Sequence, residues 1–503
     1  MACAKKGSYL SKFGYVLCKD SLQPDEIYDL KNDLVGRPIG GEFGGIKAKP
    51  DTYILYTETK NKLYIPKMYG LKKYGNPKEH QMYLGSRFAN TISFKGELLP
   101  LQIEASQKML LSLSQKGGAI LSLGTGLGKT TTCLHILSKL NKKTIVIVNK
   151  ITLMKQWEEE IKKFLPEASI GFIQGQKNVD THGKDIIIAM LQSLAKIDYP
   201  KELFEDIGCT VVDEIHNTSS KVFSKVLMKM CSQYTIGLTA TPQRSDGCDY
   251  VFKWFIGDVV FTSKAKREGL IPIVYTIKLE SVEYKEITIE NKFTSKQQIQ
   301  FTSMVTSLIN MKKRNELIIE KLRNLVKEKR RILVLSDRRE HLYILKGLLD
   351  EARESFSYGL FLGAMKMKDL QKSKCCQVIL ATYAAFGEGV SEKDLDTLFL
   401  VSPKKYVGHL QNSSKNESGK LEQIVGRIFR KDHIDIQPMI IDIQDNFSVY
   451  RNQSKQRMTF YKEHFTRLMY RSEHINLDTG ENCKPMRSDE ERKEIKYDVC
   501  LLD

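Results

Sequence analysis

Short apolar runs alternate with helical patterns along most of this chain. In a first territory, residues 96–262, the runs lie at 119–123, 144–148, 185–189, 209–213 and 235–239. In a second territory, residues 269–470, they lie near 332–336, 358–362, 377–381, 397–401 and 438–443. Short apolar runs that alternate with amphipathic helices are typical of strands buried in a parallel sheet. The pattern therefore predicts an α/β fold with two lobes, each a doubly wound parallel sheet.

Residues 1–95 follow a different pattern. Apolar and polar positions alternate in TYILYTE and LYIPKMYG, with Gly-rich stretches nearby, which predicts a small β-rich or α+β module. Tyrosines and lysines are interleaved there: Tyr53, Tyr56, Lys60, Lys62, Tyr64, Lys67, Tyr69, Lys72, Lys73 and Tyr74. Aromatic rings between cations favour a grip on nucleic acid. Strands rich in Tyr with Lys on their solvent face would give the same pattern.

The last part of the chain is basic. Residues 444–475 have a helical pattern, and their cations either track phosphates or form a solvated face: Arg451, Lys455, Arg457, Lys462, Arg467 and Arg471. Residues 476–503 have mixed charge and little pattern, so we expect them to be partly disordered. We therefore expect an accessory module at 1–95, lobes at 96–262 and 263–475, and a tail at 476–503.

Composition limits the class of protein. The 503 residues carry a formal net charge of +18, which suits a polyanionic partner. No apolar run is long enough to span a membrane, and the first residues lack the apolar core of a secretory signal. The ten cysteines show no C-x-x-C spacing, which argues against zinc and a disulfide framework and suits a reducing compartment.

The segment LSLGTGLGKT at 121–130 predicts a strand, a phosphate-binding loop and a helix. Lys129 can reach the outer phosphates of a nucleotide, and the Thr130 hydroxyl can bind Mg²⁺. The loop residues whose backbone can wrap the phosphates are Gly124, Thr125, Gly126, Leu127 and Gly128. Leu123 stands where the full pattern has its first Gly, and a chance Gly-Lys-Thr in a surface turn is the alternative. The context favours binding of ATP or GTP.

A pair of carboxylates follows another apolar run, in VVDEIH at 211–216. Asp213 and Glu214 are expected at the carboxyl end of a parallel strand, the edge where such sheets bind ligands. Asp213 can hold Mg²⁺ through its water shell, and Glu214 can orient and deprotonate an attacking water. An acidic turn after a strand is the alternative, but the phosphate loop upstream favours the catalytic interpretation.

Two further motifs carry hydroxyls and arginines. In GLTATPQRSDG at 237–247, Thr239 and Thr241 are expected beside the Asp213 strand. In QIVGRIFR at 423–430, Arg427 and Arg430 are three residues apart and share one face of a helix, with Ile424, Ile428 and Val425 as core candidates. Two guanidinium groups on one face can clamp a transferring phosphoryl group, although an isolated basic helix would be solvated.

The ordered set GTGLGKT, DEIH, GLTATP and QIVGRIFR resembles the motifs of superfamily 2 helicases and translocases. DEIH with GLTATPQRSDG is similar to the XPB/UvsW-type group, and especially to its relatives in large cytoplasmic DNA viruses, such as the poxviral transcript-release helicase. ELLPLQIEA at 97–105, TIVIVNKITLMKQW at 144–157 and DIIIAMLQSL at 185–194 are similar to further motor segments. Asn149-Lys150 and Ser391 depart from the family pattern, and the polar insert 404–420 is expected to be a loop.

The resemblance implies two RecA-like lobes, ATP and Mg²⁺ as cofactors, and DNA, single-stranded or duplex, as the partner. It implies that Gln102 reads adenine and that Gln423, Arg427 and Arg430 complete the catalytic set of Lys129, Asp213 and Glu214. It also implies that His216, Thr239 and Thr241 couple the nucleotide to nucleic acid. Tracking from 3′ to 5′ and work with the repair or transcription machinery follow from the resemblance alone.

Several alternatives stay open. The chain could act on RNA, since no reader of a 2′-hydroxyl can be named, or it could remodel nucleoprotein without separating strands. An architectural factor with decayed catalysis is disfavoured because every catalytic residue type is present. A nuclease or restriction subunit would need an additional carboxylate-Lys constellation, and the chain shows no convincing one.

Overall fold

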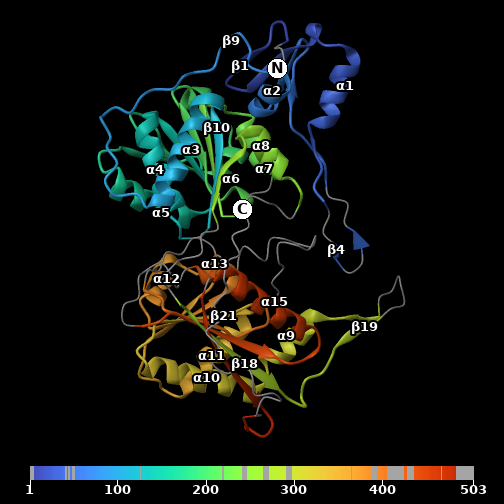
Figure 1. Cartoon of the computed structure of the whole chain (residues 1–503), viewed down its shortest axis with the longest axis vertical. Helices are drawn as coiled ribbons and strands as arrows, with labels where there is room; N and C mark the ends of the chain where they lie inside the picture. Colours follow the sequence, from blue (N-terminus) through green and yellow to red (C-terminus); the bar gives the residue numbers. More distant parts are fainter. Residues whose placement is uncertain are drawn as a thin grey trace, which may run out of the picture. The chain divides into compact units, whose positions relative to one another are not determined.

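The computed structural model describes residues 5–39, 42–43, 46–47, 51–124, 126–217, 220–240, 246–263, 271–290, 297–363, 365–387, 394–404, 424–426, 436–465 and 467–482. Its contacts divide the chain into two compact units, Met1–Lys264 and Ala265–Asp503 (Figure 1). Among the residues so described, no helix is long and apolar enough to cross a membrane.

The first unit contains an eight-stranded sheet in the order β13-β12-β14-β11-β15-β16-β10-β17. Its strands are β10 (Gly118–Leu123), β11 (Thr144–Val148), β12 (Ile170–Gln174), β13 (Asn178–Asp180), β14 (Ile186–Met190), β15 (Cys209–Val212), β16 (Tyr234–Thr239) and β17 (Val259–Ser263). All neighbouring pairs are parallel except β12 with β13. The five strands expected in this territory are all present.

Helices cover both faces of this sheet because successive side chains of a strand point to opposite sides. Ile145 and Ile147 of β11 belong to one core, and Val146 and Val148 belong to the other. The second core is shared with α3 (Pro100–Lys116), α4 (Lys129–Leu140) and α5 (Ile151–Phe164). The first is shared with α6 (Leu191–Lys196), α7 (Ser220–Leu227), α8 (Asp249–Phe255) and the N-terminal strands. Short 3₁₀ turns are η2 (Lys201–Phe204) and η3 (Ile215–Asn217).

The N-terminal residues form the expected small α+β module. Its mixed five-stranded sheet has the order β7-β8-β2-β1-β9. The elements are β1 (Tyr9–Ser11), β2 (Gly14–Cys18), η1 (Lys19–Ser21), α1 (Pro24–Asp33), β7 (Thr57–Glu58), β8 (Lys62–Ile65), α2 (Lys67–Tyr74) and β9 (Glu79–His80). Two small pairs accompany it, β3 (Val35–Gly36) with β6 (Tyr53–Ile54) and β4 (Glu42–Phe43) with β5 (Ile46–Lys47).

A buried lysine joins this module to the large sheet. Lys67, at the start of α2, is 3% exposed, and its Nζ donates to the carbonyl oxygens of Gly117, Ser232 and Gln233 at 3.0–3.1 Å. Burial lowers the pKa of this ammonium. Because the three carbonyls use all three donors of the ammonium, Lys67 fixes α2 against the amino ends of β10 and β16.

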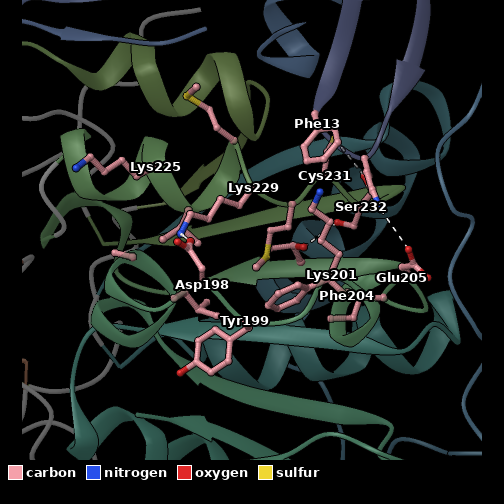
Figure 2. A pocket seen from close by; sticks show the side chains of 18 of the residues that line it. Phe13, Asp198, Tyr199, Lys201, Phe204, Glu205, Lys225, Lys229, Cys231 and Ser232 are labelled. Atoms are coloured by element: carbon pink, nitrogen blue, oxygen red, sulfur yellow. Dashed lines mark hydrogen bonds and ion pairs between the residues drawn. The ribbon is translucent and has the colours of Figure 1, made fainter. Parts of the chain in front are cut away.

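A cavity of about 700 Å³ lies where the turn between β1 and β2 meets the large sheet (Figure 2). Its wall is mostly apolar, and Lys229 pairs with Asp198 beside it. Thr210 and Ser232, near the amino ends of β15 and β16, also line it. The cavity is therefore remote from the carboxyl edge of the sheet, where the phosphate loop lies.

The second unit contains a seven-stranded sheet, entirely parallel, in the order β22-β23-β21-β24-β25-β18-β26. Its strands are β18 (Ile273–Glu280), β21 (Ile332–Ser336), β22 (Tyr358–Phe361), β23 (Val378–Thr382), β24 (Thr397–Leu400), β25 (Met439–Asp445) and β26 (Met469–Asn476). The helices are α9 (Phe301–Ile309), α10 (Lys312–Lys327), α11 (Arg339–Glu351), α12 (Met367–Lys374), α13 (Tyr383–Gly387) and α15 (Ser448–His464), and a small hairpin joins β19 (Thr288–Glu290) to β20 (Gln297–Ile299). The fold prediction of two parallel-sheet lobes is confirmed.

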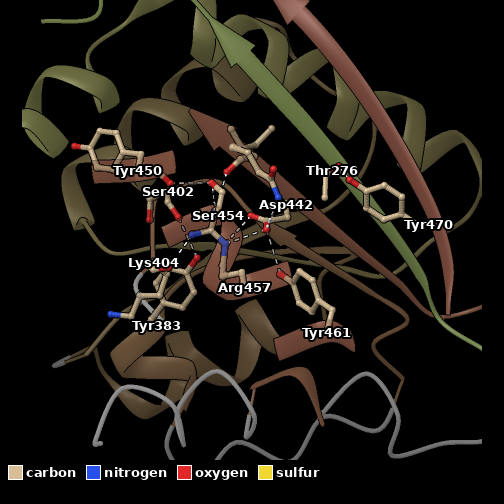
Figure 3. A network of polar contacts seen from close by, with 12 residues as sticks. Thr276, Tyr383, Ser402, Lys404, Asp442, Tyr450, Ser454, Arg457, Tyr461 and Tyr470 are labelled. Atoms are coloured by element: carbon tan, nitrogen blue, oxygen red, sulfur yellow. Dashed lines mark hydrogen bonds and ion pairs between the residues drawn. The ribbon is translucent and has the colours of Figure 1, made fainter. Parts of the chain in front are cut away.

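The prediction of a helix through 444–475 is wrong in part. The helix α15 ends at His464, and β26 then pairs in parallel with β18. The six cations named for this segment also divide. Arg457 is buried, with its Nε 2.9–3.0 Å from both carboxylate oxygens of Asp442, and its Nη1 donates to Lys404 O at 2.7 Å (Figure 3). The other five are exposed. Arg457 is therefore a core ion pair and cannot track phosphates.

Candidate active site

The phosphate loop connects β10 to α4 as the sequence predicts. Gly126 and Gly128 have φ angles of +81° and +80°, in the left-handed region that favours glycine. A Cβ on Gly128 would lie 2.2 Å from Gln102 Nε2, so a larger residue there would also displace the end of that side chain. Lys129 begins α4, and its Nζ donates to Leu123 O at 3.2 Å. The lysine therefore lies against its own loop.

Gln102 contacts this loop from α3. Its Nε2 donates to Leu127 O at 3.1 Å, and its Oε1 accepts from the backbone N–H of Leu99 at 3.0 Å. The side chain is 6% exposed. Gln102 therefore supports the loop from outside, and its reading of adenine stays a prediction.

The carboxylates stand at the carboxyl end of β15, next to β11 and β16. Asp213 is 5% exposed and accepts two hydrogen bonds of 2.8 Å, one at Oδ1 from the backbone N–H of Glu214 and one at Oδ2 from Trp157 Nε1. Glu214 has a φ of +47°, a conformation that costs an ordinary residue about 1 kcal/mol. The chain therefore turns sharply between the two acids.

Electrostatics in this corner are strong. Burial, and next the charge of Glu214, raise the pKa of Asp213 to about 6, while the hydrogen bond from Trp157 and the charge of Lys129 lower it. Lys129 is therefore close enough to act on Asp213. Two neighbouring carboxylates at a partly buried site favour a cation or a proton between them. The phosphate loop after β10 and the acidic pair after β15 lie at the same carboxyl edge of the sheet.

His216 lies two residues beyond the acidic pair, in η3. Its Nδ1 is 2.9 Å from Thr239 Oγ1 and 3.3 Å from Glu214 Oε2. Thr239 ends β16 and is fully buried. The imidazole thus links Glu214 to the neighbouring strand that carries the TATP motif. The coupling role of His216 and Thr239 stays a prediction.

Some predicted residues lie outside the described part of the chain. These are Thr125 of the phosphate loop, Thr241 of the TATP motif, and Gln423, Arg427 and Arg430 of the arginine helix. Ile424 and Val425, between them, are described and fully buried in the core of the second unit, as predicted. Thr130 is half-buried in the first turn of α4.

The donors present suit Mg²⁺ bound together with phosphates. Among the described residues, no group of three or more His, Cys, Asp or Glu side chains could form a protein cage for a metal. Mg²⁺ in nucleotide sites needs only one or two carboxylates or hydroxyls beside phosphates and waters. Asp213 and Thr130 provide that set.

The aromatic and basic residues of the N-terminal module are only partly available to a ligand. Tyr53, Tyr69 and Tyr74 are buried, and the hydroxyls of Tyr69 and Tyr74 donate to Asp33 and Glu26. Lys67 is buried as described above. These four residues cannot stack on bases or meet phosphates, so the core interpretation holds for them.

The sequence analysis did not predict the hydrogen bond between Trp157 and Asp213. Trp157 lies in the segment at 144–157 that resembles a motor motif, but its indole is 1% exposed and bonded to Asp213. The available signal was weak: Trp157 is one of two tryptophans in the chain, on the apolar face of an amphipathic helix.

Comparisons with known proteins find similar sequences among viral helicases. Residues 95–244 match the family model described as "Type III restriction enzyme, res subunit". The chain is 28% identical over 463 residues to a protein of Acanthamoeba polyphaga mimivirus named as an ATP-dependent RNA helicase, covering 90% of this chain and 85% of the relative. It is 28% identical over 440 residues to a protein of Invertebrate iridescent virus 6 named as a helicase, covering 83% and 91%.

A solved structure shares the fold. The fragment of an HsdR subunit of a type I restriction enzyme from Vibrio vulnificus covers 78% of this chain and 71% of its own, with a TM-score of 0.50 and 18% identity. At that identity the likeness concerns the arrangement of the sheets and helices.

Proposed function

We propose that the chain is an ATP-dependent helicase of superfamily 2 and that it works as a DNA motor, which its match to the restriction-subunit model and its viral helicase relatives support. It couples ATP hydrolysis to movement along DNA or to unwinding, tracks from 3′ to 5′, and acts in repair or in transcription, for example in transcript release. The motifs DEIH and GLTATPQRSDG support its place in the XPB/UvsW-type group, beside the helicases of large cytoplasmic DNA viruses.

The observation that carries the motor proposal is the contact of His216 with both Glu214 and Thr239. A site that only hydrolysed ATP would need the acid pair and the phosphate loop alone. Here the imidazole connects Glu214 to Thr239 at the end of β16, where the TATP motif begins. Such a link suits an enzyme in which hydrolysis changes a second binding site.

The phosphates of ATP bind at the N-terminus of α4 and along the glycines of the loop, where N–H groups and the helix dipole favour anions. When ATP binds, Lys129 exchanges its hydrogen bond to Leu123 O for contacts with the outer phosphates. Thr130 and Asp213 would hold Mg²⁺, which would neutralise phosphate charge. Gln102 reads adenine.

Glu214 acts as the base for the attacking water. Its Oε2 is shielded from solvent, and its described polar neighbour is His216 Nδ1 at 3.3 Å, a contact too loose to count as a hydrogen bond, so the oxygen keeps lone pairs for a water. Gln423, Arg427 and Arg430 complete the catalytic set. The arginines stabilise the charge on the γ-phosphate, with Arg430 in contact and Arg427 beside it.

Nucleic acid binding follows from the helicase class and suits the net charge of +18. We assign accessory gripping to exposed cations of the N-terminal module, such as Lys60, Lys72 and Lys73. The boundaries 1–95, 96–262, 263–475 and 476–503 remain our proposal for the functional parts.

RNA is the second candidate substrate. The mimivirus relative is named as an RNA helicase, and the iridescent virus relative is named as a helicase without a substrate. A remodeller of nucleoprotein that does not separate strands would use the same ATP site. We favour DNA because the motifs at 213–216 and 237–247 resemble DNA-acting members of the superfamily.

The experiment measures ATP hydrolysis by the full chain during titration with single-stranded DNA, duplex DNA and RNA of matched length. The expected result is stimulation by DNA at lower concentration than by RNA. Preferential stimulation by RNA would make RNA the proposed substrate. No stimulation by any of the three would refute the proposal that the chain is a nucleic-acid motor.

A strand-displacement assay then tests polarity. Duplexes with a 3′ single-stranded tail should open faster than duplexes with a 5′ tail. Preference for the 5′ tail would contradict the assigned direction, and stimulated hydrolysis without displacement of either duplex would favour the remodeller.

A further inference from the structure

The cavity between the N-terminal module and the large sheet takes no part in the proposed hydrolysis of ATP (Figure 2). Its volume is about 700 Å³, within the range of about 300–1,000 Å³ that is usual for small-molecule sites. One wall comes from the turn between β1 and β2, with Lys12 and Phe13, and another comes from α6 and η2. Junctions of this kind, between two folded parts of a chain, are common places for ligands.

The buried residues of the wall are apolar or carry polar atoms that are already paired. Leu194 and Ile207 contribute buried apolar side chains. The hydroxyls of Thr210 and Ser232 lie 2.8 Å apart, and Ser232 Oγ is also 2.7 Å from Tyr234 O. Among the described lining residues, every shielded side-chain N or O atom has a hydrogen-bond partner. The body of a ligand would therefore gain from the burial of apolar surface and would need no hydrogen bonds.

The same wall carries an excess of positive charge, with four lysines and two acids. Two of the lysines form ion pairs with the two acids, at 2.5 and 3.2 Å: Lys229 with Asp198, and Lys12 with Glu205. The other two, Lys201 and Lys225, have no acidic partner among the described residues. Lys201 begins η2, and its Nζ lies 6.0 Å from the centre of the Phe13 ring. An anionic group is therefore the complement of this part of the wall.

Large apolar side chains of the cavity also face solvent. Ile54 is 58% exposed and Tyr83 is 47% exposed, and both line the cavity. Exposed apolar surface beside a cavity is typical of a ligand-binding site. A peptide suits this site less well, because its backbone N–H and C=O groups would lie against an apolar wall whose shielded polar side chains are already paired. The observations favour a small molecule.

We propose that this cavity binds an apolar molecule with a single anionic head group, the chemical class to which fatty acids belong. The apolar body lies against Leu194 and Ile207, and the head group contacts the Lys201 ammonium beside Phe13. The ligand contacts the N-terminal module and the large sheet together, so its binding stabilises the attachment of the module. The inference goes beyond the proposed motor and does not depend on which nucleic acid the chain acts on.

The first test is calorimetric titration of the full chain with sodium dodecanoate, below the concentration at which it forms micelles. We expect saturable binding of about one molecule per chain. Dodecanol and dodecylammonium share the apolar chain but lack the negative charge, and they should bind about tenfold more weakly.

A charge reversal tests the head-group contact. Lys201→Glu should lower the affinity for dodecanoate about tenfold, leave the affinity for dodecanol within about threefold of the wild type, and make dodecylammonium the tighter ligand. Lys196→Glu is the matched control, because Lys196 is an exposed lysine of α6 that is not among the lining residues. It should bind all three compounds as the wild type does. An equal loss of dodecanoate affinity in the two variants would contradict the contact with Lys201.

A second variant fills the cavity. Ala195 of α6 is half-buried and lines the wall, so Ala195→Phe places a ring in the space that the apolar body would use. Binding of dodecanoate and of dodecanol should both be lost. The rate of ATP hydrolysis should stay within about twofold of the wild type, because the cavity is remote from the phosphate loop, and this rate also shows that the variant is folded. If Ala195→Phe does not fold, the exchange of head-group preference in Lys201→Glu decides alone.

Three results would overturn the inference. The first is the absence of saturable dodecanoate binding to the wild type, and the second is equal binding by the wild type and a folded Ala195→Phe. The third concerns a peptide of alternating Leu and Glu, which carries apolar and anionic groups on a peptide backbone. If this peptide binds more tightly than dodecanoate and Ala195→Phe abolishes its binding, the cavity takes a protein segment and not a small molecule.

Discussion

At the scale of single residues, the roles proposed for Lys129 and Glu214 lead to a first prediction. Lys129→Ala should abolish ATP hydrolysis, since the outer phosphates lose their cation. Glu214→Gln should lower the hydrolysis rate about 10²–10⁴-fold, the usual contribution of a general base, while ATP affinity changes little because Asp213 and Lys129 remain. Turnover assays and binding of a fluorescent ATP analogue check both variants. Equal rates for Glu214→Gln and the wild type would show that Glu214 is not the general base.

The contact between His216 and Thr239 leads to a second prediction. His216→Ala should keep most of the basal ATP hydrolysis, because the imidazole is not placed on the phosphates, but should weaken strand displacement. Thr241→Ala should act in the same way. Measuring both activities on one preparation gives their ratio, and a proportional loss of the two would show that His216 has no separate coupling role.

Sequence motifs predicted the site residues that the structure brings together. Lys129, Asp213, Glu214, His216 and Thr239 follow strands whose carboxyl ends meet at one edge, so order along the chain was enough. The Trp157 contact could not be predicted in this way. It joins the middle of a helix to a strand end through tertiary packing, and an apolar face predicts only that such a side chain is buried.

At the scale of elements, the ion pair between Arg457 of α15 and Asp442 of β25 carries a prediction for stability. Arg457→Met should lower the free energy of unfolding by about 3–5 kcal/mol, because Asp442 would keep a buried charge without its partner. Urea denaturation of the full chain measures this change. Arg451→Met, an exposed residue of the same helix, is the control and should change stability by about 0.5 kcal/mol or less.

A buried histidine gives the second unit a pH dependence. His341 of α11 is fully buried between Ser336 Oγ and Asn315 Oδ1, each 3.0 Å from a ring nitrogen. Burial, with the charge of Arg314, lowers its pKa from 6.5 to about 3. Between those values the unfolded chain binds a proton that the folded chain does not, so stability falls as the pH drops below about 6.5.

The histidine contribution amounts to about 1.4 kcal/mol for each pH unit well below 6.5. In His341→Gln this part of the slope should disappear, because glutamine does not titrate. Urea midpoints of both proteins between pH 7 and pH 5 provide the comparison. Parallel slopes would show that His341 is not the group responsible.

Strands formed by continuous apolar runs were predictable, and strands of mixed pattern such as β18 and β26 were not. The strands β11, β21 and β23 are fully buried, and each therefore contains an uninterrupted run of apolar residues. The edge strand β26 has mostly exposed or half-buried side chains, so MYRSEHIN carries no apolar pattern and was assigned to the preceding helix. Position at an edge is decided by pairing with distant segments, which local pattern does not report.

At the scale of the whole molecule, the role proposed for Arg430 leads to a prediction about hydrolysis. Arg430→Ala should lower the hydrolysis rate about 10³–10⁵-fold with a much smaller change in ATP affinity. Arg430→Lys should restore little, because an ammonium is a point charge without the forked geometry of guanidinium. Single-turnover rates and analogue binding test this. Near-normal turnover in Arg430→Lys would mean that a simple positive charge is sufficient.

The pairing of β18 has a consequence for synthesis on the ribosome. This strand lies between β25 and β26, so both of its neighbours come from the last part of the chain. When Ile273–Glu280 leaves the ribosome, the segment from Ser281 to Pro438 has still to be made before a partner exists. The sheet of the first unit is complete at Ser263 and can form meanwhile. Until β25 and β26 are made, the backbone of β18 is unpaired on both sides, and other strands can pair with it. Nascent chains halted before Met469 should therefore recruit chaperones through the second unit and leave the first protease-resistant.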